Sequence, residues 1–243
     1  GEMKQRNIAG QEEGTFKPRE YAFVVSKSHQ INHFSMGVNV KLAGSHIQEY
    51  SAFSILADIG GVFQHPKKEF TAGLLFKNVG WVIDNYEKST QSLTPFDIQL
   101  GLSYKLNHLP LRISATAHHL NRPDIQYIDP AIHQQFTSDG EIETQEKTIS
   151  EQIARHLVIG GELLLSKNFN LRIGYNHQRR KEMITTQKSG RSGFSFGGMI
   201  RIKSFEFAFT RAFYYTAEGV SMLTLTTNMN QKFKRKQKIK TDS

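Results

Sequence analysis

Every second residue is apolar in Phe34-Ser35-Met36-Gly37-Val38-Asn39-Val40-Lys41-Leu42. A helix repeats its faces every 3.6 residues, whereas successive side chains of a strand point to opposite faces. The stretch therefore predicts a strand with one apolar face and one polar face. The same alternation continues on both sides along the chain, at 96–106, 169–176 and 194–203.

Weaker copies of the alternation occur at 21–29, 51–64, 70–83, 110–121, 155–166, 205–215 and 220–229. Together they predict an all-β chain of about eleven strands, each about nine to thirteen residues long. Strands of globular proteins average about five or six residues. Strands that cross a membrane need about nine to eleven. The lengths therefore predict an antiparallel transmembrane β-barrel.

The polar face decides against a soluble β-sandwich, lipocalin or propeller, because its charged residues would be costly in a dry core. They are well solvated in a wet lumen. The side chains expected to face the lumen are Asn39, Asp97, Gln99, Arg172, Asn176 and Arg201. Those expected to face lipid are Phe34, Val38, Ile98, Leu102, Leu171, Ile173, Phe194 and Ile200.

The links between strands alternate in length, except that the link at 216–219 is short where a long one is expected. Short links lie at 30–33, 65–69, 107–109, 167–168 and 204, and longer ones at 43–50, 84–94, 122–154 and 182–191. Outer-membrane barrels have short periplasmic turns, longer external loops and an even number of strands. With the last strand running to the periplasm, residues 1–20 become an external loop. The odd strand count predicts the C-terminal part of a larger barrel whose N-terminal strands are missing.

We expect one domain, a partial barrel over 1–229 with a long loop at 122–154, followed by a basic, disordered tail at 230–243. The net charge is +9, and much of it lies in this tail. No zinc-finger or RNA-binding motif accompanies the charge, so we expect no nucleic-acid partner. The chain has no cysteine, which excludes disulfides and thiolate metal sites.

Few residues suggest chemistry. His118 and His119 are strand neighbours that should point to opposite faces, so they predict no metal site. Asp58, Asp97, Glu162 and Glu206 could act as acid–base pairs, but pairing with Arg172, Arg201 and Lys105 is the simpler reading. Ser192-Gly193 beside His177 is a weak nucleophile candidate. We therefore expect no enzyme, no catalytic, cofactor-binding or metal residues, and no cofactor.

Two charged stretches are candidate contact sites. Arg179, Arg180 and Lys181 end a rising strand at the outer surface, where clustered cations suit the phosphates of lipopolysaccharide. Glu141, Glu143 and Glu146 lie in the long loop and could meet a basic partner surface. The alternatives are a solvated loop edge and a variable insertion. A helical turn or two is expected at 148–153.

Several segments resemble the PorQ family of the Bacteroidota type IX secretion system. They are Leu109-Pro110-Leu111-Arg112-Ile113-Ser114, Ala117-His118-His119-Leu120-Asn121-Arg122, 156–162, 166–182, and 193–219, which contains Thr210-Arg211-Ala212. The resemblance implies a FadL-like outer-membrane barrel of about fourteen strands. It also implies a non-enzymatic role in the complex that attaches exported proteins to surface lipopolysaccharide, with other proteins of that pathway as partners.

Two other functions remain open. A FadL-type channel for hydrophobic or small solutes would have a continuous ligand path, whereas a complex subunit would have a plugged lumen. A membrane enzyme such as a lipase would bring a serine, a histidine and a carboxylate together at the barrel rim.

Overall fold

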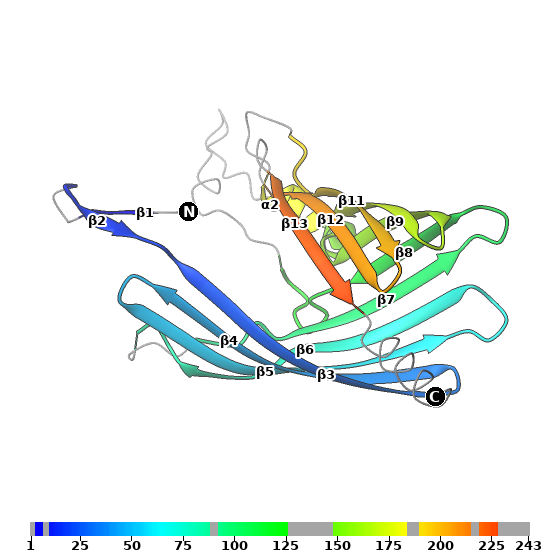
Figure 1. Ribbon diagram of the computed structural model, residues 1–243, viewed down its shortest axis with the longest axis horizontal. Helices are drawn as coiled ribbons and strands as arrows, with labels where there is room; N and C mark the ends of the chain where they lie inside the picture. The colour runs from blue at the N-terminus through cyan, green and yellow to red at the C-terminus, as the bar shows by residue number, and fades with distance from the viewer. Residues whose placement is uncertain are drawn as a thin grey trace, which may run out of the picture. The chain divides into compact units, whose positions relative to one another are not determined.

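The structure is a computed structural model that describes residues 3–6, 10–87, 92–125, 148–183, 190–214 and 219–227. The chain is all-β. Eleven strands, β3 to β13, form one antiparallel sheet in which each strand pairs with its neighbours in the chain. A separate hairpin pairs β1 with β2 (Figure 1). The chain divides into two compact units, one of 1–66 with 71–100 and one of 67–70 with 101–243.

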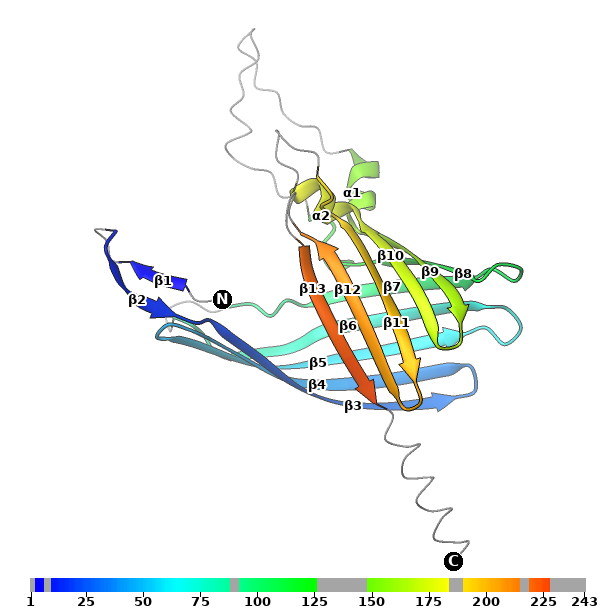
Figure 2. The ribbon, with the colours of Figure 1, turned by 45° about the horizontal axis from the view of Figure 1, so that its top comes forward.

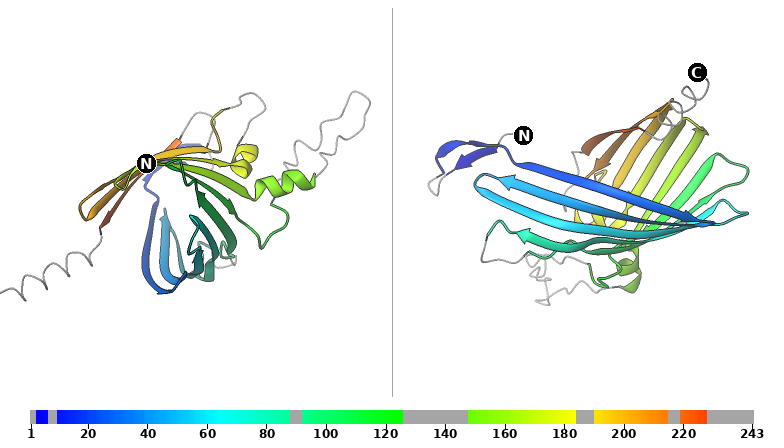
Figure 3. Two further views of the ribbon diagram at one scale, coloured as in Figure 1. Left: turned by 90° about the vertical axis from the view of Figure 1, so that its right-hand side faces the viewer. Right: turned by 60° about the horizontal axis from the view of Figure 1, so that its bottom comes forward.

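The first unit contains long strands, of which β3 to β6 are joined by short turns. They are β3 (Arg19–Ile31), β4 (Phe34–Ile47), β5 (Tyr50–Gln64), β6 (Phe70–Asp84) and the start of β7 (Asp97–Lys105). Figure 3 shows β3 to β6 side by side in its right-hand view. The hairpin of β1 (Met3–Arg6) and β2 (Glu12–Phe16) lies within residues 1–20, where we expected only a loop.

The second unit carries the rest of β7 and six shorter strands. These are β8 (Leu111–Ala117), β9 (Leu157–Ser166), β10 (Phe169–Asn176), β11 (Phe194–Ile202), β12 (Phe205–Phe213) and β13 (Gly219–Thr227). Two short helices, α1 (Ile149–Arg155) and α2 (His177–Glu182), lie at the same end of these strands (Figure 2). In the described residues, no helix is both long enough and apolar enough to cross a membrane.

All eleven expected strands are present, but several ends differ. The link expected at 43–50 is wrong, because Ala43 to Ile47 continue the β4 ladder and Ile47 pairs with Tyr50. Only Gln48 and Glu49 remain in the turn, and Gln48 adopts the positive φ of 57° that such two-residue turns use. β8 ends at Ala117, four residues earlier than expected. The helical turn expected at 148–153 is confirmed as α1.

The burial of the two sheet faces is inverted relative to a soluble protein. Along β4 the apolar side chains, such as Phe34 at 58% exposure, are exposed, whereas Asn39 and Lys41 are half-buried. We call the two sides of the sheet the apolar face and the polar face. Among the described residues, the buried hydrophobic ones are Leu56, Met199 and Phe213. The buried polar ones are Asp58, Asp97, His118, Arg155, Asn170 and Ser192.

The alternation of faces predicted from the sequence is confirmed. Of the expected apolar set, all but Ile98 are exposed, and Ile173 reaches 62%. Of the polar set, Asp97 is buried, and Asn39, Gln99 and Asn176 are half-buried. Arg172 and Arg201 are more exposed, because their long side chains reach past the backbone to carboxylates.

Candidate functional site

The basic stretch at 177–181 forms α2 rather than the end of a strand, so that expectation was wrong. β10 stops at Asn176, whose side-chain Oδ1 accepts a 2.9 Å hydrogen bond from the backbone N–H of Arg179. Asparagine is among the best residues for this N-cap. The residues of α2 are His, Gln, Arg, Arg, Lys and Glu, which have no β-branches and, after the histidine, are good helix formers. Asn176 can be recognised as an N-cap candidate in the sequence. It was assigned to the strand instead, because the alternation of apolar and polar residues continues up to it.

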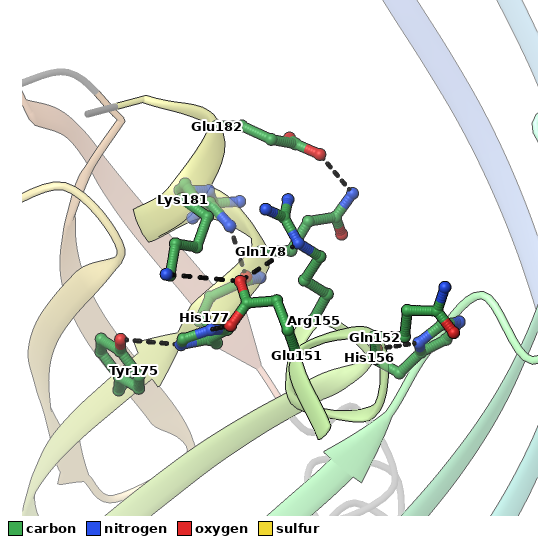
Figure 4. A network of polar contacts seen from close by, with 11 residues as sticks. Glu151, Gln152, Arg155, His156, Tyr175, His177, Gln178, Lys181 and Glu182 are labelled. Atoms are coloured by element: carbon green, nitrogen blue, oxygen red, sulfur yellow. Dashed lines mark hydrogen bonds and ion pairs between the residues drawn. The ribbon is translucent and has the colours of Figure 1, made fainter. Parts of the chain in front are cut away.

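Glu151 on α1 joins the two helices. Its carboxylate lies 3.1 Å from His177 Nε2 and 3.5 Å from Lys181 Nζ, both on α2. One turn along α1, Arg155 Nε lies 3.3 Å from the same carboxylate. Figure 4 shows the three cationic or imidazole groups converging on Glu151. The link between α1 and α2 is therefore an ionic one, centred on a single acidic side chain.

The charge of Glu151 is stabilised in this cluster. Burial by itself raises the pKa of the carboxyl group, but the hydrogen bond from His177 and the charges of Lys181 and Arg155 outweigh it. The pKa of Glu151 is therefore lower than its ordinary value, and the carboxylate is ionised at neutral pH. An ionised carboxylate only accepts hydrogen bonds, so His177 Nε2 carries the proton. In the neutral imidazole, Nδ1 then accepts from the Tyr175 hydroxyl, 3.2 Å away.

The three predicted contact residues on α2 all have partners in the chain itself. The guanidinium of Arg179 stacks on Tyr214, with 4.0 Å from its central carbon to the ring centre. Arg180 donates to the backbone carbonyl of Gly190. Lys181 faces Glu151 and keeps 44% of its side chain exposed. Lys181 is therefore the best placed of the three to reach a ligand. Arg179 and Arg180 instead hold α2 in place through their contacts with Tyr214 and Gly190. Glu141, Glu143 and Glu146 lie outside the described residues.

The carboxylates considered as acid–base groups are paired on the polar face. Glu162 on β9 lies 2.9 Å from both Arg112 on β8 and Arg172 on β10. Glu206 pairs with Arg201 at 2.6 Å, and Lys105 with Glu69 at 3.9 Å. The expected pairing is confirmed for Glu162 with Arg172 and for Glu206 with Arg201. Asp58 instead pairs with Lys41, and Lys105 with Glu69, while Asp97 accepts from Gln99. The pairs of Glu162 and Glu206 lie across neighbouring strands and therefore help to fix the sheet register.

Asp58 on β5 forms a second polar cluster, in the first unit. Its carboxylate lies 2.6 Å from Lys41 Nζ on β4 and accepts a 2.9 Å hydrogen bond from the backbone N–H of Asn78. Asn78 has a φ of 58° at an irregularity between β5 and β6. Its side-chain nitrogen also donates to the carbonyl of Pro95. The cluster anchors a β-bulge and binds the β6–β7 link to the sheet.

Ser192 is not placed to act as a nucleophile. It is fully buried, at 0% exposure, and Gly193 beside it has a φ of 86° that favours glycine. Both ring nitrogens of His177 are occupied by Tyr175 and Glu151. His177 therefore supports the helix contact and is not paired with the serine.

The expectation that His118 and His119 are neighbours on a strand is wrong. β8 ends at Ala117, so the two histidines are not strand neighbours, and His119 has a φ of 56°. Their rings meet edge to face, with centroids 4.7 Å apart. Within the part of the chain that the structure describes, no group of three or more His, Cys, Asp or Glu side chains is arranged to hold a metal ion.

No family model matches the chain, and no curated protein is significantly similar to it.

Proposed function

We propose that this chain spans the bacterial outer membrane as part of an antiparallel β-barrel. The proposal rests on the burial of the two sheet faces, because the apolar face is exposed and the polar face is more buried. Strands of nine to fifteen residues, such as β5, β7 and β9, expose an apolar face and turn Asp58, Asp97 and Glu162 to the other. Exposed apolar area costs about 25 cal/mol per Å² in water, whereas contact with lipid removes that cost. The polar face suits a wet lumen.

Within that membrane, we propose a non-enzymatic subunit of the type IX secretion and attachment complex. The resemblance to the PorQ family over 95–122 and 155–229 supports this role. Its partners would be other proteins of that pathway together with outer-membrane lipid and lipopolysaccharide. The α1–α2 end, with Lys181 exposed, and the acidic residues at 141–146 are the surfaces we assign to these contacts.

The test is co-purification of the tagged full-length protein from detergent-solubilised outer membrane. We expect other type IX envelope proteins in the eluate, and exported cargo left unattached to the surface in a deletion strain. A deletion strain that attaches its cargo normally, together with an eluate free of such proteins, would contradict the proposed role. The membrane location is tested separately by whether the protein fractionates with the outer membrane and shows heat-modifiable gel mobility.

A solute channel is the second candidate, and a cavity in the first unit favours it. The cavity has a volume of about 470 Å³ and is lined by small and aromatic residues, among them Ala43, Ser45, Phe53, Ser54 and Tyr86. It is large enough for a small amphipathic molecule. If the deletion strain attaches cargo normally but no longer takes up a hydrophobic solute, the channel replaces the complex subunit.

A further inference from the structure

The apolar face of β10 to β13 contains a groove of about 540 Å³. The sheet register places Leu171, Gly198, Phe209 and Leu223 in one row across these strands. The next row contains Phe169, Ile200, Phe207 and Leu225. Gly198 has no side chain to fill its place in the first row, so the aromatic and aliphatic neighbours surround an open depression.

Two arginines, Arg211 and Arg191, lie against one aromatic ring on the strand that borders this groove, and the described residues offer neither an acidic partner. Arg211 is on the same face as Phe209, two residues further along β12, and pairs in register with Phe196. The guanidinium carbons of Arg211 and Arg191 lie 5.7 and 4.9 Å from the centre of the Phe213 ring. Among the described residues, neither guanidinium forms an ion pair with a carboxylate. Arg211 donates only to the Ser221 hydroxyl, at 3.3 Å.

Among the described residues, the two acidic side chains of α1 and α2 nearest this end already have partners. Glu151 is held by Arg155, His177 and Lys181, and Glu182 accepts from Gln178. Two like charges on one aromatic ring repel each other unless an anion lies between or beside them. In the part of the chain that the structure describes, the apolar groove is thus followed by two guanidinium groups without a carboxylate partner, with Arg211 one strand repeat of about 7 Å from Phe209.

We propose that the groove and the arginine pair bind a phosphorylated lipid, with an acyl chain over Gly198 and a phosphate at Arg191 and Arg211. Guanidinium groups bind phosphate oxygens through paired, charge-assisted hydrogen bonds. The groove lining is apolar apart from the Thr224 hydroxyl and the backbone, which suits a hydrocarbon chain. A free phosphate would bind only to the two arginines, whereas a neutral lipid would contact only the groove. This inference rests on the proposed membrane-spanning function.

The test uses the full-length protein in nanodiscs of phosphatidylcholine doped with lipid A, or with lipid A whose phosphates have been removed. We expect the protein to retain the phosphorylated form preferentially during delipidation, measured by native mass spectrometry. The double variant Arg191→Gln/Arg211→Gln should lower that retention at least about tenfold. The matched control is Arg201→Gln, because Arg201 pairs with Glu206 on the polar face. That control should retain lipid A as the unaltered protein does.

The groove is tested by Gly198→Leu, which should lower retention of lipid A but leave competition by inorganic phosphate unchanged. A Cβ at this position would lie 3.3 Å from Leu171 Cδ2, so folding is checked first. If Gly198→Leu does not fold, the double variant Leu223→Thr/Leu225→Thr makes the groove polar and should have the same effect. Equal retention of both lipid A forms by protein that inserts normally overturns this inference alone. Failure to insert into bilayers contradicts the proposed function instead.

Discussion

Arg172 on β10 donates a 2.9 Å hydrogen bond from Nε to the carboxylate of Glu162, its direct partner on β9. Arg112, the partner of Glu162 on β8, donates to the other carboxylate oxygen at 2.9 Å. One acidic side chain, 16% exposed, therefore joins three consecutive strands. It does so on the polar face, where a single charge between two guanidinium groups fixes the register of both strand pairs.

Replacing Glu162 by Gln should lower the free energy of unfolding by about 1–3 kcal/mol. The change leaves two guanidinium groups facing a neutral amide and repelling each other. Urea titration of the detergent-solubilised protein measures the effect. The control is Glu206→Gln, which removes only one partner, Arg201, and should cost less than about 1 kcal/mol. An equal loss in both variants would show that Glu162 has no special role in joining the strands.

The two faces of β7 should respond in opposite ways to a charge. Leu102 lies exposed on the apolar face, and Ser103 is half-buried on the polar face. If the apolar face meets lipid, Leu102→Arg should cost about 2–4 kcal/mol near the bilayer centre. Ser103→Arg should be tolerated. Denaturant titration in lipid vesicles measures both, and a larger loss in the Ser103 variant would reverse the assignment of the faces.

The strands could be predicted because a long alternation of apolar and polar residues fits only a strand with one apolar and one polar face. From Phe34 to Leu42, no helical face collects the apolar residues, and the observed pairing of β3, β4 and β5 follows from neighbouring repeats. The turn between β4 and β5 was missed because Gly44, Ser45 and His46 resemble loop residues by composition. Only their partners across the ladder, Phe53 to Ser51, show that they belong to strands.

The α1–α2 contact could not be predicted from the sequence. Glu151 and Lys181 are thirty positions apart, and nothing in the spacing brings them together. The contact depends on α2, which forms because Asn176 caps it, and on β9 and β10 pairing so that both helices emerge at one end. The positive charge at 179–181 is evident from the sequence, but Glu151 as the partner of Lys181 is not.

The contact between α1 and α2 should weaken in acid. The folded pKa of Glu151 is lower than its value in the unfolded chain, so its stabilising contribution is complete above the ordinary glutamate pKa. The contribution is lost as the pH falls from there through the lowered pKa. The measurement is the difference in unfolding free energy between the unaltered protein and Glu151→Gln across this range. We expect a difference that shrinks on acidification, and a constant difference would mean that the cluster does not stabilise the carboxylate.

Partner binding should depend on the acidic residues of the long loop rather than on the sheet. The triple variant Glu141→Gln, Glu143→Gln and Glu146→Gln removes three negative charges from the segment between β8 and α1. If this segment meets a basic partner surface, the loss should mainly slow association and increase its salt dependence. Heat-modifiable mobility should be unchanged, because the variant leaves the described strands β8 and β9, between which this segment lies in the chain, unaltered.

The measurement for this triple variant is the yield of co-purifying envelope proteins at low and high salt, relative to the unaltered protein. Lys181→Gln is the matched comparison at the α1–α2 end, since Lys181 is partly exposed and pairs with Glu151. A reduced yield with the triple variant but not with Lys181→Gln assigns the partner contact to the loop. A reduced yield with Lys181→Gln alone assigns it to the helix end. Unchanged yields in both variants would exclude charge at either surface as the basis of the interaction, and would move the search to the apolar face of β10 to β13.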